Sequence, residues 1–234
     1  MFVLNTIVAD VLSEIADELE KAKNVRASAQ KILCKIAKEH RRIIYNGDNY
    51  IPEWVEEAEK RGLANMRSTV ESLGTIMDEE NVRVFAKHKV LSQTELHARR
   101  DILFEVYSKM INIEALTMLN MAKRQILPAA VEYSRRLADA VNAVNSTGID
   151  AVAHKFMLEN VCGLINSADQ AIKGLETFAE KCAKIEAVSG KAEFCRDKVI
   201  PAMSELRQYA DKLEMNVDAK FWPLPTYAEM LFLK

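Results

Sequence analysis

Residues 158–182, LENVCGLINSADQAIKGLETFAEKC, decide the fold class because their apolar residues recur with one strict period. The recurring positions are separated alternately by three and four residues, which gives a mean spacing of about 3.5, the period of helices that pack in coiled coils. These positions are Leu158, Val161, Ile165, Ala168, Ile172, Leu175, Ala179 and Cys182. The stretch predicts a long helix with a single apolar seam.

A second seam with the same period follows after Gly190. Its members are Val199, Met203, Leu206, Ala210, Leu213 and Val217. Two consecutive helices with one seam each and a short joint are expected to pair as an antiparallel hairpin. We therefore predict a long, coiled-coil-like helical hairpin over residues 150–219.

The first half of the chain also has helical periodicity. Apolar residues step by three or four through 3–22, at Leu4, Ile7, Val11, Ile15 and Leu19. A second helix is predicted over 26–45. A short third helix is expected to begin at Pro52 and to stop at Gly62, and a further helix is expected to take Asp78 as its N-cap.

A helix of unusual length is predicted between residues 92 and 145. Ser92 and Glu95 form the S-x-x-E pattern of a capping box, and Pro128 is expected to kink the helix without ending it. Its middle, MINIEALTMLNMAKRQIL, is apolar nearly all round, which predicts a central buried helix. Gly148 is expected to end this helix and Asp150 to cap the next one.

Composition agrees with a fold made of long helices. The 234 residues include only seven glycines and five prolines, whereas strands need frequent turns rich in these residues. We predict an all-α fold: a helical bundle domain over 25–234, with the long antiparallel hairpin inside it and a short proline and aromatic tail at its end.

The tail, KFWPLPTYAEMLFLK at residues 220–234, is rich in apolar side chains and follows a charged predicted helix in the sequence. Pro223 and Pro225 should force extended geometry on the residues before them, and Thr226 with Glu229 predicts one last short helix. Burying such side chains is favourable, so the tail is expected to fold back on the bundle or to dock on a neighbouring subunit or domain. The predicted docking residues are Trp222, Pro223, Pro225, Tyr227, Leu231 and Phe232.

Charge excludes some classes of partner. The net charge is −2, and the 32 basic and 34 acidic residues are interleaved, so no nucleic-acid or membrane surface is predicted. No apolar stretch is long enough to span a bilayer. The N-terminus is interrupted by Asp10 and Glu14 and lacks a basic region, unlike a signal peptide.

No catalytic, cofactor-binding or metal-binding residue is predicted. The chain has no glycine-rich phosphate loop, and its four histidines form no Glu-x-x-His pair, so they are expected to be solvated or locally hydrogen-bonded. The four cysteines, including Cys195, are widely spaced, which favours free thiols over disulfides or a metal site. Cys34, Cys162 and Cys182 sit among apolar positions, so we interpret them as small core residues.

Three stretches resemble the C-terminal region of type III glutamine synthetases. They are HRRIIYNGDNYIPEWVEEAEKRGLANMRST, FAKHKVLSQTELHARRDILFEVYSKMINIEALTMLNMAKRQILPA and AMSELRQYADKLE with FWPLPTYAEMLF. INIEALTM and WPLPTY are particularly specific to that family, and FVLNTIVADVLSEIADELEKA looks like the helix that follows its last catalytic motifs. The resemblance covers nearly the whole chain and is weakest around 145–190.

The resemblance implies a function that composition and periodicity do not show. Members of that family are large cytoplasmic ligases that make glutamine from glutamate, ammonia and ATP with a divalent metal, Mg²⁺ or Mn²⁺, and they assemble as homo-oligomeric dodecamers. Their metal, glutamate and nucleotide motifs lie upstream of the matching segment, so no catalytic residue is carried over. The chain is then expected to be a fragment of such an enzyme, inactive alone, in which 1–24 continues from the catalytic domain.

Two hypotheses follow. The first is a non-catalytic helical domain that packs on the catalytic domain of the same enzyme and on neighbouring subunits. The second is a free-standing interaction or regulatory module that binds a protein or a small nitrogen metabolite, as the heptad hairpin and the aromatic tail also allow.

Overall fold

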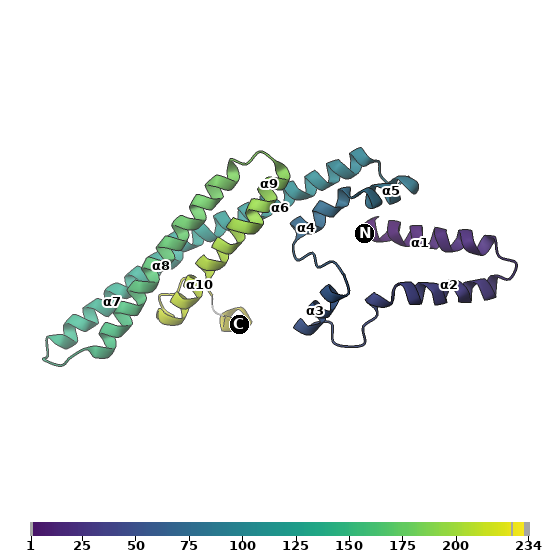
Figure 1. The fold of residues 1–234 in the computed structure, drawn as a ribbon. Helices are drawn as coiled ribbons and strands as arrows, with labels where there is room; N and C mark the ends of the chain where they lie inside the picture. Colours follow the sequence, from purple (N-terminus) through teal and green to yellow (C-terminus); the bar gives the residue numbers. More distant parts are fainter. Residues whose placement is uncertain (1, 226, 232–234) are drawn as a thin grey trace. The chain divides into compact units, whose positions relative to one another are not determined.

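The computed structural model describes residues 2–225 and 227–231, and every regular element among them is helical (Figure 1). The prediction of an all-α fold is therefore confirmed. The chain divides into two compact units, which we call the N-terminal unit, Met1–Leu103, and the C-terminal unit, Phe104–Lys234.

The N-terminal unit is built from short helices and the start of a long one. They are α1 (Phe2–Glu20), α2 (Val25–Glu39), a 3₁₀ turn (Arg41–Ile43), α3 (Pro52–Lys60), α4 (Thr69–Gly74), a 3₁₀ turn (Thr75–Met77), α5 (Glu79–Lys87) and the first turns of α6 (Gln93–Met121). Pro52 is the first residue of α3, as predicted. Gly62 follows that helix with a φ of 70°, a left-handed conformation that glycine adopts without strain.

Helix caps follow the predictions in part. The box at Ser92 forms, because the Ser92 amide donates to Glu95 Oε2 at 2.8 Å and the Glu95 amide donates to Ser92 Oγ at 3.3 Å. Asp78 occupies the N-cap position of α5, but its side chain accepts no capping hydrogen bond. A second capping box, formed by Ser68 and Glu71, begins α4 and was not predicted.

The N-terminal unit buries a small set of apolar side chains, Val70, Leu73, Phe85 and Leu96. α1 contacts α2 and α5. Phe2 brings its ring within 5.7 Å of the ring of Phe85, measured between centroids, and Thr6 is buried. The side of α1 that faces its own unit is therefore set by Phe2, Thr6 and Asp10, which is not the predicted apolar stripe.

The C-terminal unit is a bundle of three long helical segments. The first comprises α6 from Phe104, a π turn (Ala122–Ile126) and α7 (Leu127–Asn145); the second is α8 (Val152–Ala183). The third comprises α9 (Val188–Phe194), a π turn (Cys195–Val199) and α10 (Ile200–Asn216), and the short α11 (Tyr227–Leu231) follows. α8 packs against both α7 and α10, and Figure 1 shows α10 returning beside α8, which confirms the predicted hairpin.

The predicted seams form the core of this bundle. Of the eight seam positions in 158–182, six are buried: Val161, Ala168, Ile172, Leu175, Ala179 and Cys182. From the second seam, Val199, Leu206, Leu213 and Val217 are buried. The core extends to the first segment through Ala115, Leu119, Ala122, Ile126 and Ala130. The hairpin thus becomes a three-helix bundle because the first segment covers its open side.

One local prediction in this region needs correction, and one feature, a π turn, was not predicted. Gly148 ends α7 with a φ of 81°, as expected, but Asp150 does not cap α8. Ala151 is the N-cap residue, and Asp150 Oδ1 instead accepts a hydrogen bond from Lys155 Nζ at 2.7 Å. Pro128 was expected to bend the long helix; the structure places a π turn just before it.

Candidate docking surfaces

The central helix α6 carries an open apolar face in the C-terminal unit, which we call the α6 face. It consists of Val106, Met110, Ile113 and Leu116, whose side chains are between 51% and 59% exposed. These spacings of three and four place the four residues on one side of the helix. The opposite side is buried through residues that include Phe104, Ala115 and Leu119.

This face overturns the prediction that the middle of the helix is buried all round. A sequence that is apolar on every side of a helix indicates that the whole helix is buried. It does not indicate which partner buries each side. Within this chain the bundle covers one side only. Covering the rest would be worth about 1 kcal/mol per residue, because roughly half of each side chain is still accessible. A contiguous apolar patch of this kind marks an interaction site.

Helix α1 carries a second open apolar face, which we call the α1 face. Its most exposed members are Leu4, Val8, Val11 and Leu12, each more than half exposed. Leu4, Ile7 and Val11 of the predicted stripe are thus exposed, whereas Ile15 and Leu19 are half-buried. Only the first part of the stripe is left open by the N-terminal unit.

Polar contacts hold α1 in this orientation. Asp10 Oδ1 accepts hydrogen bonds from Lys87 Nζ at 2.6 Å and from His88 Nε2 at 2.8 Å, both at the end of α5. The hydrogen bond from Lys87, followed by that from His88, lowers the pKa of Asp10 below its ordinary value of 3.8. At the start of the helix, the Arg99 guanidinium lies 5.2 Å from the centroid of the Phe2 ring. The polar side of α1 thus contacts the rest of the N-terminal unit, and its apolar face is left exposed.

The structure places the predicted tail residues in three different situations. Trp222 is half-buried and packs on the second core cluster, formed by Ile126, Ala130, Ala168, Leu213 and Val217, whereas Pro223 and Pro225 are exposed. Leu231 is 74% exposed on α11. The side chain of Tyr227, and all of Thr226 and Phe232, lie outside the described residues.

Phe221, which the sequence analysis passed over, joins Trp222 on this cluster. Its ring lies 4.8 Å from the Arg136 guanidinium and 6.0 Å from the ring of Tyr133, both on α7. The signal for it was present, because Phe221 continues the second seam four residues beyond Val217. The indole Nε1 of Trp222 is buried, and the described part of the chain offers it no hydrogen-bond acceptor.

Comparison with known proteins identifies the fold family. The family described as "Glutamine synthetase C-terminal domain" matches residues 28–145, which run from α2 through α7 and include the α6 face. The chain belongs to this family. The resemblance to the C-terminal region of glutamine synthetases is thereby confirmed.

Relatives of this glutamine synthetase C-terminal domain extend the match to both ends of the chain. A type-3 glutamine synthetase of Dictyostelium discoideum is 36% identical over 99% of the chain, and a glutamine synthetase of Butyrivibrio fibrisolvens is 30% identical over 97%. A glutamine synthetase of Bacteroides fragilis (strain YCH46) is 26% identical over 100%. The chain spans about a third of the length of each of these relatives (33%, 32% and 34%).

Over residues 2–225 and 227–231, no group of three or more His, Cys, Asp or Glu side chains could hold a metal ion. No helix in the part that the structure describes is both long and apolar enough to cross a membrane. The described side chains therefore do not fit a metal centre, and the features they do offer are the two open apolar faces.

Proposed function

We propose that this chain is the non-catalytic C-terminal domain of a type III glutamine synthetase and supports ATP-dependent synthesis of glutamine from glutamate and ammonia. The observation that carries the proposal is the pair of open apolar helix faces in a member of the glutamine synthetase C-terminal domain family. The domain would act by packing, because burial of these faces requires protein partners.

The α1 face would pack on the catalytic region of the same enzyme. Its apolar residues have no partner in the N-terminal unit, since α1 is attached to that unit through Phe2, Thr6 and Asp10. The relatives have about twice as much additional chain as this domain supplies, which is enough for a separate catalytic domain. Residues 1–24 would then connect and fix that domain to the helical bundle, residues 25–234.

The α6 face would pack on a neighbouring subunit. It lies on the central helix, two of its four residues, Ile113 and Leu116, belong to the INIEALTM segment that carries the family resemblance, and the bundle beside it has its own buried core. A rigid bundle with one open stripe is suited to a repeated contact between identical subunits. In the assembled enzyme we expect a homo-oligomer, a dodecamer as in type III glutamine synthetases. The tail residues Trp222, Pro223, Pro225, Tyr227, Leu231 and Phe232 remain candidates for an additional contact.

ATP and a divalent metal, Mg²⁺ or Mn²⁺, would be held outside this domain in the full-length, cytoplasmic enzyme. The domain itself would contribute position and rigidity to the catalytic region, and no chemical step is assigned to its side chains.

A reconstitution experiment tests this proposal. The chain is mixed with a separately produced catalytic region of a type III glutamine synthetase, and the mass of the mixture and the rate of ATP-dependent glutamine formation are measured. We expect a complex and a gain in rate. A free-standing module, the alternative function, would leave both the mass and the rate of the catalytic region unchanged.

A further inference from the structure

Two cysteines that are 13 residues apart in the sequence meet in the core of the C-terminal unit. Cys182 lies in the last turn of α8, and Cys195 begins the π turn that follows α9. Their Sγ atoms are 3.1 Å apart, and the two residues are only 5% and 1% exposed. The reversal of the hairpin therefore brings the two sulfurs into direct contact.

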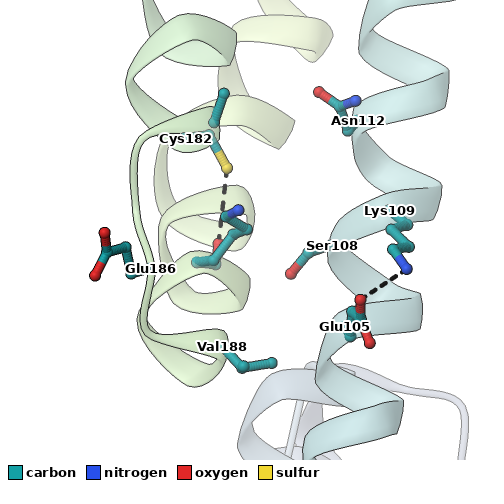
Figure 2. Close-up of a pocket in the computed structure, with 9 residues that line it drawn as sticks. Glu105, Ser108, Lys109, Asn112, Cys182, Glu186 and Val188 are labelled. Atoms are coloured by element: carbon teal, nitrogen blue, oxygen red, sulfur yellow. Dashed lines mark hydrogen bonds and ion pairs between the residues drawn. The ribbon is translucent and has the colours of Figure 1, made fainter.

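One of the two cysteines lines a cavity of about 350 Å³ (Figure 2). Cys182 lines this cavity together with Ser108, Lys109 and Glu186, whereas Cys195 is not among the lining residues. The Cys182 sulfur donates a long hydrogen bond of 3.9 Å to the carbonyl oxygen of Lys191. A small oxidant that entered the cavity would meet Cys182 first.

We propose that Cys182 and Cys195 form a reversible disulfide, in which Cys182 reacts with a peroxide and Cys195 resolves the oxidised sulfur. The proposal concerns a modification site in the bundle, and it stands independently of the docking function proposed above. It names hydrogen peroxide as the oxidant and a dithiol as the reductant that reverses the bond.

The reaction balances in two steps. The Cys182 thiolate attacks one peroxide oxygen, the O–O bond breaks, and the departing hydroxide takes up the proton that Cys182 released, which leaves a sulfenic acid and water. The Cys195 sulfur then attacks the Cys182 sulfur, the S–O bond breaks, and the hydroxide leaves with the Cys195 proton as a second water. Two thiols are oxidised by two electrons in total, and the peroxide is reduced to two molecules of water.

The surroundings of the two thiols support this division of roles. Burial, followed by the hydrogen bond with Cys182, raises the pKa of Cys195 to about 12. Cys195 therefore stays protonated at neutral pH, and its S–H can donate to Cys182 when that residue ionises. The charges at the cavity are mixed: Glu105 pairs with Lys109 at 2.7 Å, and Glu186 and Lys191 also line the space.

Little movement separates the thiol pair from the disulfide. An S–S bond is about 2.05 Å long, so the sulfurs must approach by about 1 Å from their present contact. The bond would join the end of α8 to the first residue of the π turn and would close a loop that contains α9. Closing this loop restricts the unfolded chain more than the folded one, so the oxidised protein should unfold at a higher temperature.

The test uses the complete 234-residue chain with Cys34→Ser and Cys162→Ser, because Cys34 is exposed and Cys162 is half-buried. This background retains only Cys182 and Cys195. After treatment with hydrogen peroxide, we expect the intact mass to fall by two hydrogens, a digest to contain one peptide pair linked through these cysteines, and dithiothreitol to restore the original mass. An unchanged mass, or a gain of oxygen alone, would overturn the proposal.

Single variants in the same background separate the two roles. With Cys195→Ala, we expect dimedone to label Cys182 and no loss of hydrogens; with Cys182→Ala, we expect Cys195 to stay unlabelled. Labelling of Cys195 in the absence of Cys182 would contradict the assigned order. Circular dichroism checks that each variant is folded, and Cys195→Ser or Cys182→Ser replaces the alanine variant at the same position if that variant is not. The oxidised background protein should also melt at a temperature a few degrees higher than the reduced one. An equal or lower melting temperature would contradict the proposed disulfide.

Discussion

Pro128 and Pro201 occupy equivalent places in two different helices, each two residues after a π turn. The residue before each proline donates its amide to the carbonyl five positions back: Leu127 to Ala122, and Ile200 to Cys195. Proline lacks an amide hydrogen, and its ring collides with the carbonyl four residues earlier in a regular α-helix. The wider turn accommodates the ring, so both long segments continue past their prolines to flank α8.

This relationship predicts that the π turn in the first segment depends on Pro128. A π turn inserts one residue into an α-helix. Deleting the exposed Gln125 should therefore restore the regular α-helical hydrogen-bond register and place Pro128 inside a regular α-helix. The deletion should cost about 3 kcal/mol of unfolding free energy in the wild-type chain and about 1 kcal/mol or less in a Pro128→Ala background. Urea denaturation of the four proteins measures both costs.

Deletion of the exposed Asp139, in the regular part of α7, serves as the control. It rotates the buried Val141 by about 100° away from the core, so it should destabilise both backgrounds equally. Equal costs for the Gln125 deletion in the two backgrounds would show that Pro128 does not cause the π turn.

The attachment of α1 to α5 should weaken in acid. The pKa of Asp10 is lowered below 3.8 by hydrogen bonds from Lys87 and His88, so its carboxylate stabilises the folded N-terminal unit above that pH. This contribution is lost as the pH falls through the lowered pKa. At about pH 6, Asp10→Asn should therefore accelerate hydrogen exchange in α1. The difference from the wild type should shrink below the ordinary pKa and disappear only below the lowered pKa.

The exposed Asp17, on the same helix, provides the control as Asp17→Asn. It should leave exchange in α1 unchanged at each pH. A difference between wild type and Asp10→Asn that persisted with the carboxyl protonated would refute the assignment of this contact to charge.

The anchoring of the tail should tolerate loss of the indole N–H of Trp222. Nε1 is buried without an acceptor in the described structure, and a buried donor in that state costs free energy. Trp222→Phe should therefore change the unfolding free energy by less than about 1 kcal/mol. Trp222→Ala should lower it by about 2–3 kcal/mol, because the packing of a half-buried ring is lost. Equal losses for the two variants, measured in urea, would indicate an acceptor for Nε1.

The α6 face should determine assembly in the full-length enzyme. A charge placed on an apolar contact surface is costly to bury, so Val106→Glu should lower the mass of the oligomer in light scattering. Val131→Glu on α7 is a matched control, because the two valines are 51% and 52% exposed. It should leave the mass unchanged, and dissociation by both variants or by neither would contradict a specific contact at the α6 face.

The elements of this fold were predictable wherever a local pattern defined them. The heptad seams predicted α8 and α10, and the Ser92–Glu95 box predicted the start of α6. Pro52 and Gly62 predicted the two ends of α3. Asp78 occupies its predicted N-cap position without a side-chain capping bond, whereas the cap predicted at Asp150 was wrong, because its carboxylate accepts a hydrogen bond from Lys155 instead. The spacing of apolar residues does not predict a π turn either, because one inserted residue hardly changes that spacing.

The candidate docking surfaces were harder to predict from the sequence. Leu4 and Val11 on α1, and Val106 and Ile113 on α6, have the pattern of buried residues, yet the chain leaves them exposed. The apolar pattern shows that a face must be covered, and only the structure shows that the described part of its own unit leaves that face open. Cys34 was likewise expected in the core and is exposed, whereas the buried Cys195 was overlooked because its contact with Cys182 depends on the hairpin reversal.

The most direct test of the central claim is the mass of this chain in light scattering, measured with and without the catalytic region of a type III glutamine synthetase. We expect a complex whose formation raises ATP-dependent glutamine synthesis. The double variant Leu4→Glu, Leu12→Glu should weaken this complex at least tenfold, whereas Leu33→Glu on α2, at a comparably exposed leucine, should not. A chain that keeps its own mass in the mixture, beside a catalytic region whose rate does not change, would contradict the proposed role.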